Sequence, residues 1–152
     1  MANNLVPDSD HISRFCRKRG IGETGRITGV AFYLRENHDF VHGQYRLSVN
    51  WLEYLKLRNR DDEVNKIREV YKGKFPSSFF RGEPKIAVIN VGKMRKKVLR
   101  DTPDSRKIVV EHKPTTKDPS HSRVSGNLKL DDRLIFNFLA DCIEQEYPAN
   151  IP

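Results

Sequence analysis

The sequence contains no long hydrophobic segment. Its apolar runs are short, as in Ile86 to Ile89, whereas a transmembrane helix needs about 20 apolar residues in succession. The first ten residues are polar and acidic, and they lack both the basic and the apolar region of a secretory signal. We therefore expect a soluble, cytoplasmic protein with no membrane partner.

Cysteine is scarce, with only Cys16 and Cys142 in the chain. Without a secretory signal, two reduced thiols are more typical than a disulfide bond. Cys142 falls on the apolar stripe of a predicted helix, where a free cysteine packs as a small hydrophobic residue. Cys16 lies in a basic run, where neighbouring cations favour the thiolate. We expect both cysteines to be free.

Motifs for metal ions and for phosphate-binding loops are also missing. No Cys-x-x-Cys or His-Glu-x-x-His is present, and His38 and His42 lie in a predicted loop, where an i, i+4 pair does not converge. Residues 20–25 match Gly-x-Gly-x-x-Gly, but they lead into a predicted strand, so no helix N-terminus is available to hold a phosphate. We expect neither a metal nor a cofactor.

The sequence does contain a mixture of strand and helix patterns. Strands are predicted where β-branched and aromatic residues cluster or alternate with polar ones, over residues 27–34, 45–49, 86–91 and 108–111. Helices are predicted where apolar residues recur at helical spacing after a capping residue, over residues 51–57, 61–73, 93–100 and 131–147. Residues 75–84 and 112–127 are predicted loops.

The order of these elements predicts an α+β fold, because two early strands arrive without a helix between them. We expect a small mixed or antiparallel sheet of about four strands, covered mainly on one side, with three to four helices. The C-terminal amphipathic helix should pack on this sheet. The length suits one domain, so we expect a flexible tail over residues 1–10 and a single α+β domain over residues 11–152.

Positive charge is in surplus, with 28 basic and 20 acidic residues and a net charge of +8. Such a balance attracts nucleic acid or an acidic protein partner. The surplus gathers around Arg14–Arg19, around Lys72–Arg81 and on the predicted helix at 93–100, and the last group could follow phosphates along a strand. The alternative is a solvated helix face. The predicted binding residues are Lys93, Arg95, Lys96, Lys97 and Arg100.

Three phenylalanines lie next to basic residues in the predicted loop at 75–84. Phe75, Phe79 and Phe80 could stack on bases beside Lys74 and Arg81. Exposing three phenylalanines is costly, however, so the sequence favours a loop whose aromatic side chains fill the core.

One loop places a carboxylate, a hydroxyl and an imidazole within four residues, at Asp118, Ser120 and His121. These three cannot form a nucleophile–base–orienter triad with one another, so a site would need a partner such as His112, Ser48 or Glu53. The simpler interpretation is a turn stabilised by Asp118 and Ser120, with His121 bonded to backbone carbonyls. The catalytic candidates are therefore His121, Asp118, Ser120 and His112, and the pattern leans against an enzyme.

Several strings together are similar to a known group of sequences. They are Gly25-Arg26 with Gly29, LSVNWLEY at 47–54, Asn90-Val91-Gly92 and DPSHS at 118–122. In this order and spacing they resemble a family of short bacterial proteins with no known activity, over residues 11–148. The resemblance implies no fold, ligand or reaction, but small proteins of this sort often belong to mobile-element or anti-phage gene clusters.

The leading hypothesis is therefore a bacterial accessory or binding protein that contacts nucleic acid, or a protein partner from the same gene cluster, through its basic surface. One alternative is a small hydrolase or nuclease that uses His121. Another is a structural subunit of a larger complex, which an exposed patch of Phe75, Phe79 and Phe80 would favour.

Overall fold

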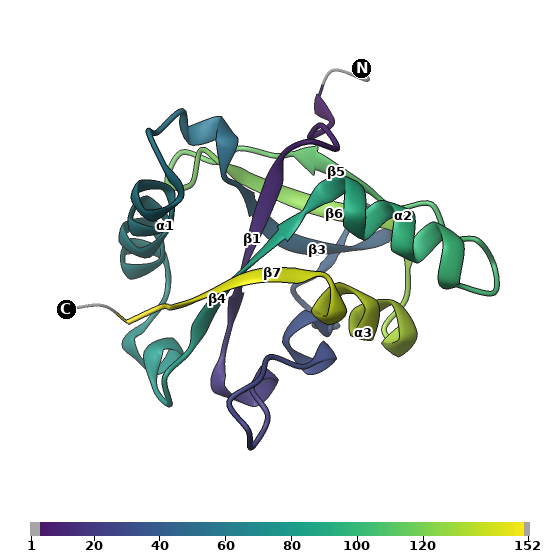
Figure 1. Ribbon diagram of the computed structural model, residues 1–152, viewed down its shortest axis with the longest axis horizontal. Helices are drawn as coiled ribbons and strands as arrows, with labels where there is room; N and C mark the ends of the chain where they lie inside the picture. The colour runs from purple at the N-terminus through teal and green to yellow at the C-terminus, as the bar shows by residue number, and fades with distance from the viewer. Residues whose placement is uncertain (1–3, 151–152) are drawn as a thin grey trace.

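Seven antiparallel strands form the frame of the protein in a computed structural model that describes residues 4–150 (Figure 1). The strands run in the order β5-β6-β3-β1-β4-β7, and the short β2 pairs with β3. Their bounds are β1 His11–Cys16, β2 Phe40–Val41, β3 Gln44–Trp51, β4 Lys85–Asn90, β5 Val109–His112, β6 His121–Leu128 and β7 Ile143–Pro148.

Within the described residues, three α-helices and four short 3-10 turns lie between these strands. The side chain of Asn59 caps the first helix by accepting a bond from Asp62 N at 2.8 Å, and Asn90 caps the second in the same way. Among residues 4–150, no helix has the length and apolar character needed to cross a bilayer. The bounds are α1 Arg60–Lys74, α2 Val91–Asp101 and α3 Arg133–Asp141, with turns at Lys18–Gly20, Gly29–Phe32, Glu53–Leu55 and Ser77–Phe80.

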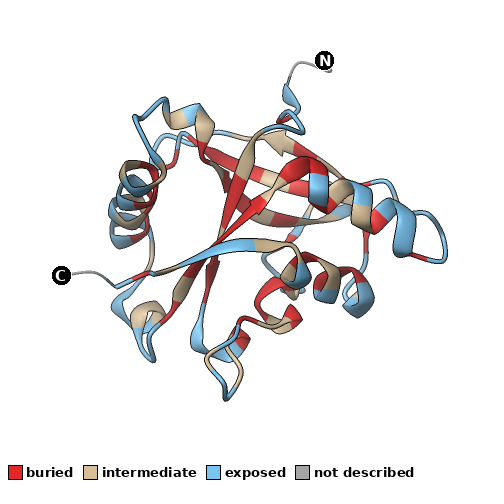
Figure 2. Ribbon diagram, in the orientation of Figure 1, coloured by how far each residue is buried: buried red, intermediate tan, exposed pale blue. Residues whose placement is uncertain are grey.

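The sheet separates two hydrophobic cores. Alternate residues of β4 point to opposite faces: Ile86 and Val88 pack with α1, whereas Ala87 and Ile89 pack in the core that holds α2 and α3. β1 and β4 are accordingly almost entirely buried (Figure 2). This agrees with the continuous apolar run at 86–91, which is typical of a strand covered on both faces. The expectation that the sheet as a whole is covered mainly on one side does not hold for the central strands.

Strands β1 and β3 pair over only two residues and then separate. Ile12 lies opposite Trp51 and Ser13 opposite Asn50, and no further pair follows along the two strands. The guanidinium of Arg14 spans the separation, donating from Nε to Ala31 O at 3.0 Å and from Nη1 to the carbonyl of Ser48 at 2.9 Å. A charged side chain thus replaces ladder bonds in the middle of the sheet.

The α+β class is confirmed, and of the two predicted sheet types the antiparallel one is observed. The C-terminal helix packs in the core as predicted, through Ile135, Phe136 and Leu139. The predicted number of strands was too low, because β1, β2, β6 and β7 were missed. β6 has the sequence HSRVSGNL, whose serines and glycine have low strand propensity, and its pairing with β3 and β5 overrides that preference.

Two other predictions, the end of one helix and the presence of one strand, were wrong for identifiable reasons. The helix predicted to Tyr147 ends at Asp141, and residues 143–148 instead pair with β4 as an edge strand. The strand predicted over 27–34 is a 3-10 turn that packs on α3. There a side chain at Gly29 would place its Cβ 2.1 Å from Oδ1 of Asn137, so only glycine permits this approach.

Part of the predicted N-terminal tail contacts the sheet. Leu5 forms a bridge with Glu111, and the buried Val6 donates its N–H to Val110 O at 2.8 Å. These two residues of the predicted tail are thus bonded to β5, and residues 1–3 lie outside the described part of the chain.

Both cysteines are free, as predicted. Cys16 is fully buried, and desolvation raises the pKa of its thiol to about 12 despite the nearby Arg14. The expectation that neighbouring cations favour its thiolate was wrong, since burial has the larger effect.

Candidate functional site

The basic helix predicted to bind a partner is α2. We call Lys93, Arg95, Lys96, Lys97 and Arg100 the α2 cluster. Four of these side chains meet carboxylates of the same chain: Lys93 pairs with Glu144 at 2.5 Å and Arg95 with Asp8 at 2.6 Å. Lys97 and Arg100 share Asp101, at 3.3 and 2.8 Å.

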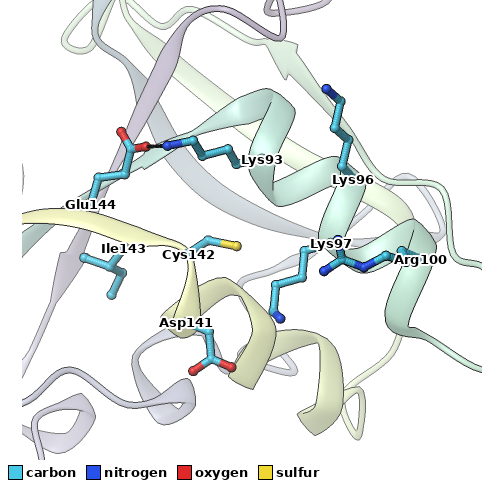
Figure 3. Close-up of a pocket in the computed structure, with 8 residues that line it drawn as sticks. All are labelled: Lys93, Lys96, Lys97, Arg100, Asp141, Cys142, Ile143 and Glu144. Carbon is cyan, nitrogen blue, oxygen red and sulfur yellow. Dashed lines mark hydrogen bonds and ion pairs between the residues drawn. The ribbon is translucent and has the colours of Figure 1, made fainter.

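Within residues 4–150, only Lys96 of the α2 cluster has no ion pair. The hydrogen bond from Lys93 to Glu144 raises the pKa of Lys93, and the bond from Arg100 lowers the pKa of Asp101 to about 2. Figure 3 shows four members of the cluster around a shallow surface pocket beside Cys142. Much of the positive charge predicted for this face is thus balanced locally.

The loop that holds the predicted catalytic residues is tied to β3 and α1 by a buried polar network. Asp118 has no exposed surface, and its carboxylate accepts bonds from Asn50 Nδ2 and Lys74 Nζ, each at 2.7 Å. Asn50 also donates to Ser120 Oγ at 2.9 Å and accepts from Tyr71 Oη at 2.8 Å. These groups satisfy one another, so Asp118 and Ser120 hold the loop in place.

His112 lies apart from this network. Its ring packs against Trp51 and Tyr54, with centroids 5.2 and 4.3 Å away, and its Nε2 lies 2.8 Å from the carbonyl of Pro119. The structure therefore does not bring His112 together with His121.

His121 occupies a different position from the other candidates. Its Nδ1 lies 2.9 Å from the carbonyl of Lys113, and its Nε2 lies 3.3 Å from Oγ of Ser48. Burial is the main cause that lowers the pKa of the ring, and the nearby cations Lys74 and Arg123 act in the same direction. Only one of the two nitrogens is bonded to backbone, because the other faces a serine from β3.

Ser48 and His121 both line a cleft of about 630 Å³. It lies where β1 and β3 separate, between residues 14–35, the C-terminal end of α1 and the start of β6. Its lining contains six basic side chains and no carboxylate. We call these six the cleft cations: Arg14, Arg17, Arg19, Arg35, Lys74 and Arg123.

Most of the cleft cations have no acidic partner. Arg35 pairs with Asp39 at 3.2 Å and Lys74 pairs with the buried Asp118. The other four, Arg14, Arg17, Arg19 and Arg123, form no ion pair within the described residues 4–150. This concentration of unbalanced charge in a concave site is the arrangement that attracts anions most strongly.

Aromatic side chains form part of the same cleft. Tyr33, Phe75 and Phe79 line it, and the guanidinium of Arg17 lies 3.8 Å from the ring centre of Phe79. The phenylalanine rings also pack on the core beside α1, so the prediction that they fill the core is confirmed. Each still leaves part of its surface exposed to the cleft.

The cleft unites groups that are scattered in the sequence. The basic segments around Arg14–Arg19 and Lys72–Arg81 are evident in the sequence, but their convergence was not predicted. Arg123 was missed because it lies in a predicted loop. The alternation of Ser48 and Asn50 along β3 was the one available signal, since it places two polar side chains on one face of a strand.

In residues 4–150 no group of three or more His, Cys, Asp or Glu side chains is arranged to hold a metal ion. Comparisons of the chain with known protein families, curated proteins and solved structures find no match. The resemblance to short bacterial proteins therefore stays a prediction, and the cleft is the feature that points to a function.

Proposed function

We propose that the protein binds single-stranded nucleic acid in the cleft. The observation that carries the proposal is the set of six basic side chains in a lining without a carboxylate. Four of them have no ion-pair partner in residues 4–150. Arg14 is held by two backbone carbonyls, whereas Arg17, Arg19 and Arg123 make no side-chain hydrogen bond there, so the charge of these three is available to phosphates. Arginine suits this role, because its planar fork of donors matches the geometry of phosphate oxygens.

The aromatic lining favours nucleic acid over an acidic protein. Single-strand binding sites combine a basic groove for the backbone with aromatic rings on which bases stack. Tyr33, Phe75 and Phe79 line the same cleft as the cations. The guanidinium of Arg17 covers Phe79, so a base that stacks on this ring would displace Arg17 toward the phosphates. A cleft of about 630 Å³ is of the size that accommodates a small ligand, so it suits one or two splayed nucleotides and not a duplex.

The α2 cluster plays a lesser part in this proposal. Because Lys93, Arg95, Lys97 and Arg100 are paired with carboxylates, a phosphate would have to displace those partners before it gained a contact. The net charge of +8 still draws a polyanion toward the molecule, and the cleft then holds it.

The test is fluorescence anisotropy with labelled DNA and RNA oligomers of about 10 nucleotides, a length within the range of single-strand binding sites. Contacts to the one or two phosphates that the cleft can hold predict a plot of log affinity against log salt with a slope near −1, from about −0.7 for each neutralised phosphate. The variant Arg17→Gln/Arg19→Gln/Arg123→Gln should bind roughly 10- to 100-fold more weakly and flatten this slope.

A matched control removes three positive charges from the α2 cluster instead of from the cleft. Lys93→Gln/Lys96→Gln/Arg100→Gln should weaken binding by no more than about 3-fold, since two of its three cations are already paired. Equal losses in the two triple variants would overturn the proposal, as would displacement of the oligomer by polyglutamate at equal charge concentration, because an acidic protein would then be the better ligand.

A further inference from the structure

Ser48 and His121 come together from two neighbouring strands. In the pairing of β3 with β6, Asn50 lies opposite His121 and Ser48 opposite Arg123. Ser48 and His121 are therefore diagonal neighbours on one face of the sheet, a position from which side chains can meet. Their Oγ and Nε2 atoms are 3.3 Å apart, and both residues line the cleft.

The surroundings of His121 determine which ring nitrogen carries the proton. The carbonyl of Lys113, 2.9 Å from Nδ1, can only accept a hydrogen bond, so Nδ1 must donate. In the neutral ring Nε2 then holds the lone pair, and the hydroxyl of Ser48 donates to it. Burial lowers the pKa of the ring, which keeps this neutral, basic form at neutral pH.

Two cations lie beside the serine. Arg14 donates to the carbonyl of Ser48 itself, and Arg123 is its partner in the strand pairing. Both line the cleft and form no ion pair within residues 4–150. A phosphate positioned at Ser48 Oγ would therefore lie in a field that stabilises additional negative charge on its oxygens.

We propose that Ser48 is a nucleophile and His121 its general base, and that together they hydrolyse a phosphodiester of a strand held in the cleft. The choice of substrate rests on the proposed binding function, whereas the pairing of nucleophile and base rests on geometry alone. The contrast with the neighbouring loop supports this assignment. Asp118 and Ser120 are sealed in the buried network, while Ser48 and His121 face the cleft.

The chemical steps balance without a further reactant except water. Ser48 Oγ attacks phosphorus as its proton passes to His121 Nε2; a bond from oxygen to phosphorus forms, and the bond to the leaving nucleoside oxygen breaks as His121 protonates that oxygen. Water, deprotonated by His121, then attacks the phosphorus that joins Ser48 to the remaining nucleotide. The bond from phosphorus to Ser48 Oγ breaks, and Ser48 takes back the proton from His121. The products are a phosphomonoester and an alcohol.

The test is covalent labelling of the folded protein with diisopropyl fluorophosphate, in which an activated serine displaces fluoride. Peptide mapping by mass spectrometry should find the adduct on Ser48 and none after Ser48→Ala. His121→Gln should slow labelling by roughly 10²- to 10⁴-fold, the usual contribution of a general base. Ser78→Ala, which changes an exposed serine, should label like the wild type.

Two further readouts separate this proposal from a structural role and from the binding proposal. The labelling rate should rise with pH and level off near neutrality as His121 loses its proton, which a purely structural histidine would not produce. The wild type should first be shown to be folded by circular dichroism and to bind oligonucleotide. Absence of a Ser48 adduct under these conditions overturns the catalytic pair and leaves the binding function. An adduct at Ser48 without oligonucleotide binding instead overturns the binding function.

Discussion

The α2 cluster and the cleft cations contain similar numbers of basic residues but differ in what surrounds them. Four of the five cations on α2 meet a carboxylate, through Asp8, Asp101 and Glu144. Four of the six in the cleft meet none within residues 4–150. A run of basic residues in the sequence therefore says little about the field it produces, because the field depends on which acids the fold brings beside it.

The two regions also differ in how they are built. The α2 cluster lies on one helix, and its acidic partners are exposed or half-exposed. The cleft collects cations from β1, α1, β6 and the segment between β1 and β2, and the two acids that pair with them, Asp39 and Asp118, are both buried. Replacing an acidic partner of the α2 cluster should therefore have little effect on stability, whereas replacing Asp118 should be destabilising.

The largest expected effect is the loss of stability on Asp118→Ala. This change leaves Lys74 and Asn50 without the acceptor that each reaches at 2.7 Å. Removing one partner of a buried ion pair costs about 3–5 kcal/mol, and we expect the lower end, about 3 kcal/mol, because Lys74 is partly exposed to water. Denaturant unfolding followed by circular dichroism measures the difference.

Two controls accompany this measurement. Asp118→Asn keeps an oxygen acceptor and should cost less than Asp118→Ala. Asp101→Ala removes the acid that serves Lys97 and Arg100 on the exposed face of α2, and it should leave the unfolding midpoint unchanged. Equal midpoints for Asp118→Ala and the wild type would remove the distinction between the two regions.

An intermediate effect is expected when the α2 cations are released. In the variant that lacks Arg17, Arg19 and Arg123, the further changes Asp101→Asn and Glu144→Gln leave Lys93, Lys97 and Arg100 unpaired. Nucleic-acid affinity should then recover by roughly 3- to 10-fold, with a steeper salt dependence. Anisotropy titrations measure this affinity. No recovery would mean that ion pairing is not what prevents the α2 cluster from binding nucleic acid.

How far the sequence predicts this arrangement depends on the range of the interactions involved. β4, α1 and α2 were predicted within a few residues, since their patterns are local: a continuous apolar run, and apolar positions at helical spacing after a capping side chain. β6 and β7 were missed because their polar strands exist through pairing with distant neighbours.

The candidate site was predictable only in fragments. His121 was identified with Ser48 as one of several partners, but adjacent Asp118 and Ser120 belong to the supporting network. Nothing local shows that β1 and β3 separate beyond Ser13 and Asn50, and this separation creates the cleft. A site formed by strands that fail to pair is invisible to any pattern within one strand.

The smallest expected effect is a dependence of stability on pH that originates at His121. Burial lowers the pKa of this ring in the folded protein from its ordinary value of 6.5; Lys74 from α1 and Arg123 from β6 lower it further, while Asp118 and the bond to the Lys113 carbonyl oppose the shift. Just below pH 6.5 His121 therefore binds a proton in the unfolded chain while it stays neutral in the folded chain. Stability should be complete above pH 6.5 and should decline as the pH falls from 6.5 toward the lowered pKa.

Unfolding midpoints of the wild type and of His121→Gln, compared at several pH values between about 5 and 8, measure this contribution. The two curves should run parallel above pH 6.5 and converge or cross below it, because the variant has no ring to protonate in the unfolded state. His38→Gln, which replaces an exposed loop histidine, should keep the pH dependence of the wild type. A His121→Gln curve that stays parallel to the wild type throughout would mean that the ring is not held neutral in the cleft. The contrast between the cleft and the α2 cluster would then rest on their ion pairs alone.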